Sequence, residues 1–539
     1  MSLIPVDNFS LFPLIPLLYA EIHYRIPGIF SRLWMDEPEI VIDLPHRLEP
    51  GQALPLLLLI KDADRYPVKL DRIDVDFYAP GVKADHWTSS FNGCTVKQPF
   101  WHQILYPACT RDLTGPIQID VKVSYRRRAK RRVCHNDNYR GSSHRPFTVL
   151  YDSAPLPGRD RCTFGDIHVH TSFTSDQVEF GAPLEATAEM ARAMGLGFFA
   201  ATDHSYDLDD LPQDYLQNDP SLTKWHQMRR RVDQLESDDM VILPGEELSA
   251  GNAGGRNVHL LLLNNDRFQH GDGDSAEKWL RNRPTLSITE ALEALSSEAL
   301  AFCAHPEIPP PPAQWLLIRR GKWCKRDLDH PRLNGLQIWN GLADNYFVRG
   351  LRQWTRLLMK GRRLSIVAGN DAHGNFGRYR QIRLPFWNLD EARNQLFGAA
   401  RTGVLARGRL SRETVTRALR EGRSLVTDGP FADLQVLNRD GAGARLGETV
   451  NSAERIRITA LSSPAFGELA KITMFTGRVG GGGENRSRVI EPDGSPYQFD
   501  RVQQMPEKPE RGYVRLEVLT SLKRRALTNP IYIDTRQTL

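Results

Sequence analysis

Short apolar runs separated by turn residues fill the first part of the chain, from about Glu39 to Tyr151. Runs such as IVIDL, LPLLLLI, IDVDFYA and IQIDVKVSY have the length of β-strands. Strands at this spacing are typical of a β-sandwich. The pattern therefore predicts an immunoglobulin-like β-sandwich over residues 39–158, preceded by an N-terminal segment of residues 1–38.

The pattern changes between about Arg161 and Asp428, where β-like runs alternate with helix-like stretches. The runs are FGDIHVH, GFFAATDH, MVILPGEE, NVHLLLLN, ALAFCAHPE, LNGLQIWN and LSIVAGNDAH, and the helical stretches include Pro183–Met194, Ile288–Ser296 and Tyr346–Met359. Such alternation predicts parallel βα units. Seven strands favour a barrel over an open sheet, so we expect a barrel over residues 159–429 with its active site at the carboxyl ends of the strands.

The last part of the chain, residues 430–539, returns to β-like runs such as RIRITAL and YVRLEVLT and predicts a second β-sandwich. The expected fold class is therefore α/β, with a (β/α)7 barrel core flanked by N-terminal and C-terminal β-sandwich domains. A chain of 539 residues is long enough for several such domains.

Composition gives weak constraints on location and partners. The net charge of +5 is small for this length, so nucleic acid is a conceivable but not a favoured partner. Six cysteines without a CxxC pair fit a reducing compartment, and we expect a cytoplasmic protein. The apolar run Leu11–Ala20 lacks the basic flank of a signal peptide and is too short for a membrane span, so no span is expected. It is interpreted as a buried or interfacial segment, with a membrane or partner contact as the alternative.

The basic stretch Arg126–Arg132 follows a strand-like run and has two interpretations. The first is a solvated hairpin tip, and the second is a contact to phosphate groups or nucleic acid.

Candidate metal-ligating side chains lie near the ends of six of the seven β-like runs. His168 and His170 are two apart, so in an extended strand both imidazoles face the same side. A lone histidine at such a place is usually structural, but the coincidence at so many strand ends favours a metal site. Imidazole and carboxylate suit Zn²⁺, Mn²⁺ and Fe²⁺. The candidate ligands are His168, His170, Asp176, His204, Glu247, His259, His305, Asp371 and His373.

The set DIHVH, TDHS, GEE, VH, AHP and GNDAH resembles the PHP superfamily, named for polymerase and histidinol phosphatase, over about half of the chain. IWNG at residues 338–341, ALREGRSLVTDGPF at 418–431 and ALTNPIYI at 526–533 are similar to its CehA/McbA branch. The resemblance implies a distorted (β/α)7 barrel with two or three divalent metal ions. It implies a first metal at His168, His170, Glu247 and Asp371; a second at Glu247, His259 and His305; and a third at Asp176, His204 and His373.

The expected function is a metal-dependent hydrolase that uses a metal-bound hydroxide, with a small-molecule phosphoester as substrate. The alternatives are a carbamate or amide hydrolase, a nuclease or phosphodiesterase, and an inactive barrel that acts as a binding or assembly protein. The sequence does not determine the oligomeric state. The expected catalytic residues are His168, His170, Glu247, Asp371 and His373.

Four further residues are expected near the site. Asn340, Arg378 and Arg380 would contact the substrate, the arginines through bidentate hydrogen bonds to phosphate, unless they form surface pairs. Asp203, next to His204, would hold a metal ligand in place.

Overall fold

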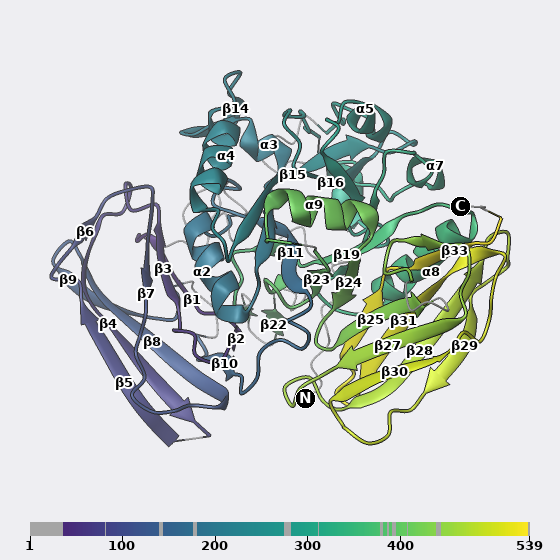
Figure 1. Ribbon diagram of the computed structural model, residues 1–539. Coiled ribbons are helices and arrows are strands. Elements are labelled where there is room, and N and C mark those ends of the chain that lie inside the picture. The colour runs from purple at the N-terminus through teal and green to yellow at the C-terminus, as the bar shows by residue number, and fades with distance from the viewer. Residues whose placement is uncertain are drawn as a thin grey trace.

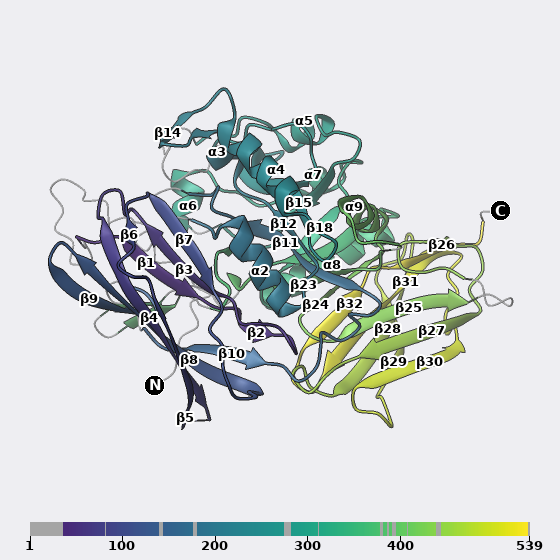
Figure 2. The ribbon, with the colours of Figure 1, turned by 60° about the vertical axis from the view of Figure 1, so that its left-hand side comes forward.

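The computed structural model describes residues 36–80, 82–138, 144–175, 180–273, 282–310, 312–377, 381–384, 387–390, 395–406, 408–437 and 443–536. Within these ranges the chain forms 33 strands and eight helices, so β-structure dominates. Figures 1 and 2 show a β-rich region from each end of the chain on either side of a middle region that carries the helices. The described helices include none long and apolar enough to cross a membrane.

The N-terminal region consists of two sheets that share a core. The smaller sheet has the order β1-β3-β7, and the larger has the order β2-β10-β8-β4-β5, with β6 and β9 at the side. Ile42 and Leu58 of the first sheet and Val75 and Val121 of the second are fully buried in one cluster. The strands are β1 (Glu39–Asp43), β2 (Arg47–Leu48), β3 (Leu56–Lys61), β4 (Val68–Ala79), β5 (Val82–Ser90), β6 (Thr95–Val96), β7 (Phe100–Leu105), β8 (Gly115–Arg127), β9 (Lys130–His135) and β10 (Phe147–Tyr151).

The middle region is built on the sheet order β19-β18-β17-β16-β15-β12-β11-β23-β24, which continues into β32, β31, β28 and β29 of the C-terminal region. Every residue of β15 and β16 is buried, as expected for strands covered on both faces. The strands are β11 (Thr163–His170), β12 (Phe198–Ala201), β15 (Val241–Gly251), β16 (Asn257–Leu263), β17 (Leu300–Cys303), β18 (Gly335–Asn340), β19 (Ser365–Gly369), β20 (Ala372–His373), β23 (Arg401–Val404) and β24 (Ser424–Thr427). Two small hairpins are β13 (Asp210–Leu211) with β14 (Asp214–Asn218), and β21 (Gln381–Leu384) with β22 (Trp387–Asp390).

The helices cover this sheet, and three of them lie at the stretches predicted from the sequence. In the longest, α8, the Asp344 carboxylate accepts hydrogen bonds from the backbone N–H groups of Tyr346 and Phe347, which starts the helix. Phe347 and Trp354, seven residues apart, are buried on its inner face. The helices are α2 (Leu184–Met194), α3 (Ser205–Leu208), α4 (Thr223–Leu235), α5 (Ile288–Glu293), α6 (Pro312–Leu317), α7 (Lys325–Leu328), α8 (Asn345–Met359) and α9 (Arg412–Glu421).

The C-terminal region consists of a three-stranded sheet, β25-β27-β30, against the extension of the middle sheet. Ile456 and Ile458 of the first layer and Ile472 and Leu516 of the second are buried in one cluster. The strands are β25 (Phe431–Leu437), β26 (Thr449–Val450), β27 (Arg455–Leu461), β28 (Leu469–Arg478), β29 (Asn485–Ile490), β30 (Gln498–Gln504), β31 (Arg511–Thr520), β32 (Arg525–Thr528) and β33 (Ile531–Asp534).

The predicted fold class, with a (β/α)7 barrel as its core, is wrong. A βα barrel requires parallel strands throughout, but β15 pairs with β16, β16 with β17, and β11 with β23 in the antiparallel sense. Among the described residues no hydrogen-bonded ladder joins β19 back to β11, so the sheet is a mixed open sheet without barrel closure. The physical reason is the short link between β15 and β16, residues 252–256, because a parallel pair needs a crossover of roughly a dozen residues or more.

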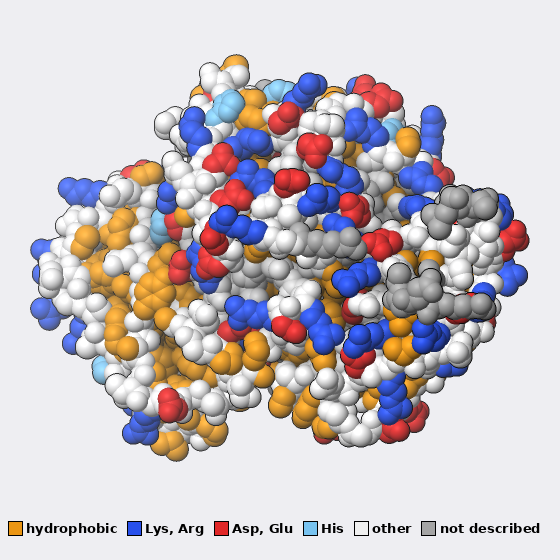
Figure 3. Space-filling view, viewed as in Figure 1, with side chains coloured by type: hydrophobic (Ala, Val, Ile, Leu, Met, Phe, Trp, Pro, Cys, Tyr) orange, Lys and Arg blue, Asp and Glu red, His pale blue; other side chains and the backbone are white. Residues whose placement is uncertain are grey.

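The basic stretch at residues 126–132 lies in the hairpin of β8 and β9, where much of its charge is paired. Arg126 donates to Asp71, Arg127 to Asp36, and Arg132 to Glu37. Figure 3 shows Lys and Arg side chains interspersed with Asp and Glu over the middle region, without a large area of one sign on that face. The hairpin tip that was predicted is present, and its carboxylate partners account for three of its arginines.

Candidate metal centre

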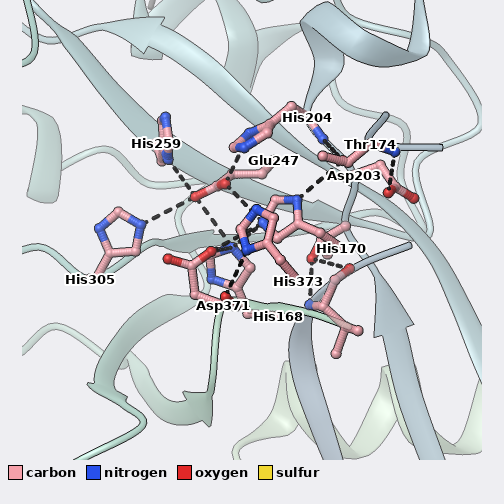
Figure 4. Close-up of polar contacts among 12 residues, drawn as sticks. His168, His170, Thr174, Asp203, His204, Glu247, His259, His305, Asp371 and His373 are labelled. Carbon is pink, nitrogen blue, oxygen red and sulfur yellow. Dashed lines mark hydrogen bonds and ion pairs between the residues drawn. The ribbon is translucent and has the colours of Figure 1, made fainter. Parts of the chain in front are cut away.

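Eight of the nine predicted ligand residues lie together in one buried cluster (Figure 4). The strands β11, β15, β16 and β20 and the segments that follow β12, β17 and β19 each contribute to it. The eight residues are His168, His170, His204, Glu247, His259, His305, Asp371 and His373. The ninth, Asp176, lies outside the described residues.

Strand register explains why the histidines of β11 and β20 meet. His168 and His170 alternate along β11 and so lie on one face of it. β20 runs parallel to β11 with His373 opposite His170, and their rings stack with centroids 4.0 Å apart and planes 8° apart. The Nε2 atoms of His168 and His170 are 3.3 Å apart, so the imidazoles converge on a common point.

Glu247 lies at the centre of the cluster. Its Oε1 atom is 3.3 Å from His168 Nε2, 2.5 Å from His259 Nδ1 and 3.2 Å from His305 Nε2. Its Oε2 atom is 3.4 Å from His170 Nε2 and 3.1 Å from His204 Nδ1. His259 reaches it because β16 is antiparallel to β15, with Leu261 opposite Glu247 and His259 diagonal to it on the same face.

The second carboxylate, Asp371, approaches from the segment between β19 and β20. Its Oδ1 atom is 3.1 Å from His170 Nε2 and 3.4 Å from His168 Nε2. Asp371 and His305 have φ angles of 54° and 28°, which L-amino acids with a side chain rarely adopt. Strained backbone of this kind concentrates at functional sites, where the surrounding structure holds it.

The surroundings of both carboxylates favour their ionised form. Burial alone would raise their pKa values, but His259 and His168 hold the pKa of Glu247, and His168 that of Asp371, well below the usual range. Burial would lower the pKa of His168, yet Glu247 and Asp371 raise it to about 9. Burial, together with His373 and His204, lowers the pKa of His170. Two buried negative charges therefore require positive charge close by.

The donor atoms suit divalent cations. The potential ligand atoms form three overlapping groups, in each of which all atoms lie within 4.8 Å of one another: His170, His204 and His373; His168, His170, Glu247 and Asp371; and His204, Glu247 and His259. His168 Nδ1 lies 2.9 Å from the Gln337 Oε1 acceptor, so in the neutral ring the lone pair of Nε2 points at carboxylate oxygens. Lone pairs that converge with carboxylate oxygens favour a cation between them. The residues present therefore fit two or three such ions.

Five supporting residues were not found from the sequence. Gln337, fully buried on β18, fixes the His168 ring, and Thr174 Oγ1 lies 3.3 Å from His170 Nδ1. Arg320 lies 3.0 Å from His259 Nδ1. Asp166 accepts hydrogen bonds from the backbone N–H of His168 and from Asn370, which joins β11 to the segment carrying Asp371. Two of them had a local signal: Asp166 lies two residues before His168 in FGDIHVH, and Asn370 directly precedes Asp371 in GNDAH.

Side chains that are adjacent in the sequence point in different directions at this site, as Asp203 with His204 and Glu246 with Glu247 illustrate. Asp203 accepts hydrogen bonds from the backbone N–H groups of Thr171 and Thr174, so it holds the loop after β11. These hydrogen bonds hold the loop and do not involve the His204 ring. Glu246 points away from Glu247 and accepts a hydrogen bond from Ser205, and burial raises its pKa to about 8.

A small pocket, open to solvent, adjoins the cluster at His305. Asn340, predicted as a substrate contact, lines it and accepts a hydrogen bond from Gln337 Nε2. Arg378 and Arg380, the predicted phosphate contacts, lie outside the described residues.

Comparisons with known proteins assign no family to the chain. No family model matches it, and no curated protein matches it. Solved structures with weak similarity include a β-glucuronidase from Bacteroides uniformis, at 8% identity and a TM-score of 0.18. The match covers 92% of this chain and 61% of that one. Another is a β-glucuronidase from Parabacteroides merdae, at 9% identity with a TM-score of 0.19, covering 92% of this chain and 65% of that one. The chain thus spans less than two thirds of the length of these proteins, and TM-scores this low transfer neither a fold nor an activity.

The predicted phosphoesterase function is corrected on these findings. The barrel on which it depended is not closed, because no hydrogen-bonded ladder joins β19 back to β11 among the described residues. The ten described residues that line the pocket beside the cluster include no Lys or Arg to hold a phosphate group. The alternatives that shared the barrel, a carbamate or amide hydrolase, a nuclease or phosphodiesterase, and an inactive binding protein, are withdrawn with it.

Proposed function

We propose that the cluster is the metal centre of a hydrolase and holds two or three divalent ions such as Zn²⁺, Mn²⁺ or Fe²⁺. The observation that supports this most directly is the buried Glu247 carboxylate, which has five imidazole nitrogens within 2.5–3.4 Å of its oxygens. Such a set is costly to bury as bare charges and is a common ligand set for divalent metals. The resemblance to the PHP superfamily remains a prediction that rests on the residue motifs.

Three overlapping groups of residues would hold the ions. His168, His170, Glu247 and Asp371 would hold one. His259, His204 and His305, around the other side of Glu247, would hold a second, and Glu247 would bridge the two. His204 could instead hold a third ion together with His373, since each imidazole offers one lone pair.

Divalent ions in such a centre act as Lewis acids and lower the pKa of bound water, which is the chemistry that hydrolysis needs. The chain's own residues prepare the site for it. Gln337 fixes the His168 ring through Nδ1, and Asn370 and Asp166 keep the Asp371 segment beside β11. Asn340 lies where it can donate a hydrogen bond to a substrate in the adjoining pocket, since its Oδ1 already accepts from Gln337.

The first experiment measures metal content by elemental analysis of the purified full-length chain and of His168→Ala. We expect two or three equivalents of divalent metal in the parent protein and a loss of at least one in the variant, because His168 faces both carboxylates. His226→Ala is the matched control, since His226 is exposed on α4 and lies outside the cluster. A parent protein that binds no divalent metal, or a variant with full metal content, would contradict the assignment.

The reaction class is tested separately with p-nitrophenyl substrates that cover carboxylic ester and glycoside bonds. We expect turnover on at least one of these bonds that is lost on chelation and restored by one added metal. Turnover that survives complete removal of the metal would reject the metal centre as the source of activity.

A further inference from the structure

Arg320 places a guanidinium group directly beside the proposed metal centre. Its Nη2 atom lies 3.0 Å from His259 Nδ1, and the same imidazole nitrogen lies 2.5 Å from Glu247 Oε1. An arginine side chain stays charged in proteins, and its planar fork of N–H donors matches the geometry of a carboxylate group. A permanent positive charge is therefore placed next to residues that would hold metal ions.

The backbone of Arg320 is fixed to the strand that carries His259. Arg320 lies opposite Asn257 in a short parallel bridge. The backbone N–H of Asn257 donates to the Arg319 carbonyl, and the Asn257 carbonyl accepts from the backbone N–H of Gly321. Asn257 is fully buried and precedes His259 by two residues on β16. Backbone pairing therefore sets the position of Arg320 relative to the ligand.

Arg320 lies near the side of the cluster that a substrate can reach. The Glu247 side chain is 1% exposed, whereas those of His305 and Asp371 are 12% and 20% exposed. The rings of His305 and His259 have centroids 5.5 Å apart, and Figure 4 shows both on the same side of Glu247. Arg320 itself is half-buried. Its guanidinium therefore adjoins the ring next to the accessible edge.

An ion and the guanidinium cannot use the same imidazole nitrogen. His259 Nδ1 offers one lone pair, and an ion held by Glu247 and His259 would take it. The N–H of Arg320 that faces Nδ1 can then donate to an oxygen atom bound beside the ion.

The charges of the cluster favour an anionic group at this place. Two divalent ions would bring four positive charges, against the two negative charges of the Glu247 and Asp371 carboxylates. Arg320 adds a further positive charge. A surplus of this sign attracts an anionic group and repels a cationic one.

We propose that Arg320 is a substrate-binding residue that holds a carboxylate group of the substrate at the edge of the metal centre. The proposal rests on the proposed function, because the ions supply most of the positive charge. The guanidinium adds direction to it, since two parallel N–H groups can donate to the two oxygens of one carboxylate.

Ligand binding to full-length protein loaded with Co²⁺ tests the proposal without a measurement of activity, because visible absorption of the ion changes when a ligand binds. Acetate is the carboxylate probe. Imidazole, used at about pH 8 where it is uncharged, is the neutral probe and needs the metal alone. The Co²⁺ content of each variant is measured in the same samples.

We expect Arg320→Gln to weaken acetate binding roughly tenfold and to leave imidazole binding unchanged, because it removes charge-assisted hydrogen bonds to the carboxylate alone. Arg320→Lys keeps the charge without the planar fork and should lose less. Arg326→Gln, at an exposed position on α7, removes the same charge away from the cluster and is the control. It should change the affinity for neither probe.

The possible failures are distinguishable. Unchanged acetate affinity in Arg320→Gln at full Co²⁺ content would overturn the role of Arg320 and leave the metal centre in place. Lower Co²⁺ content with equal weakening of both probes would show that Arg320 only holds His259 in position, which also overturns the proposal. A parent protein that takes up no Co²⁺ would reject the metal centre and the carboxylate site together.

Discussion

At the scale of single residues, the site depends on side chains that hold the imidazoles in one orientation. Gln337 is fully buried, and its Oε1 atom lies 2.9 Å from His168 Nδ1. This contact fixes the tautomer that presents Nε2 to Glu247 and Asp371. Residues that support a metal ligand in this way are worth about 10–100-fold in metal affinity.

We therefore expect Gln337→Leu to weaken metal binding by about 10–100-fold, measured by competition with a chelating dye. The leucine has a similar volume but leaves the His168 Nδ1–H without an acceptor. Gln337→Glu is the matched variant, because it keeps an oxygen at the same place and should bind metal at least as tightly as the parent. Equal affinities in the leucine and glutamate variants would show that Gln337 only fills space.

The residues that the sequence identified share one property, namely a local pattern. His168 and His170 alternate along one strand, and Glu247 lies two residues after Gly245 at the end of the run MVILPGEE, so each could be assigned to the cluster from its neighbours in the sequence. Gln337 and Arg320 have no such pattern, because their roles arise only when β18 and the segment after α6 come together with the ligands in space.

At the scale of elements, strand existence was predictable but strand direction was not. All seven predicted runs became strands, namely β11, β12, β15, β16, β17, β18 and β19, yet β15 and β16 form an antiparallel pair. The signal was present in the five residues with two glycines that join them, since this link is too short for a parallel crossover. The prediction of a barrel is therefore inconsistent with this link.

Close packing of β19 on β11 gives a prediction at this scale. A Cβ at Gly369 would lie 2.7 Å from His168 Cβ and 3.0 Å from the His168 backbone nitrogen, and neither can move without the strand. Gly369→Ala should therefore push β19 from β11, lower stability by about 1–3 kcal/mol in denaturant unfolding and reduce metal content. Gly482→Ala is the control, because nothing lies within 4 Å of the added carbon. If Gly369→Ala keeps full stability and metal content, β19 and β11 can move apart at no cost and the prediction is wrong.

At the scale of the whole molecule, the N-terminal sheets are joined to the middle region by buried polar contacts. Arg47, 2% exposed, lies 3.1 Å from Glu49 and 3.0 Å from Asp152, and it donates to the Met194 carbonyl at the end of α2. Asp43 accepts hydrogen bonds from the backbone N–H groups of Phe376 and Gly377, three and four residues after His373. The N-terminal region thus supports the segment that follows β20.

Removing Arg47 should destabilise the molecule as a whole. Arg47→Met keeps most of the side-chain volume but leaves the Glu49 and Asp152 carboxylates buried without it, which costs about 3–5 kcal/mol for a broken buried pair. Arg409→Met, which breaks an exposed ion pair with Asp238, should cost about 0–1 kcal/mol. Urea unfolding followed by both tryptophan fluorescence and circular dichroism measures the difference. If the buried contacts of Arg47 couple the two regions, the transitions seen by both probes should move together to lower urea concentration in Arg47→Met. Separate transitions would show that the N-terminal sheets unfold independently of the metal centre.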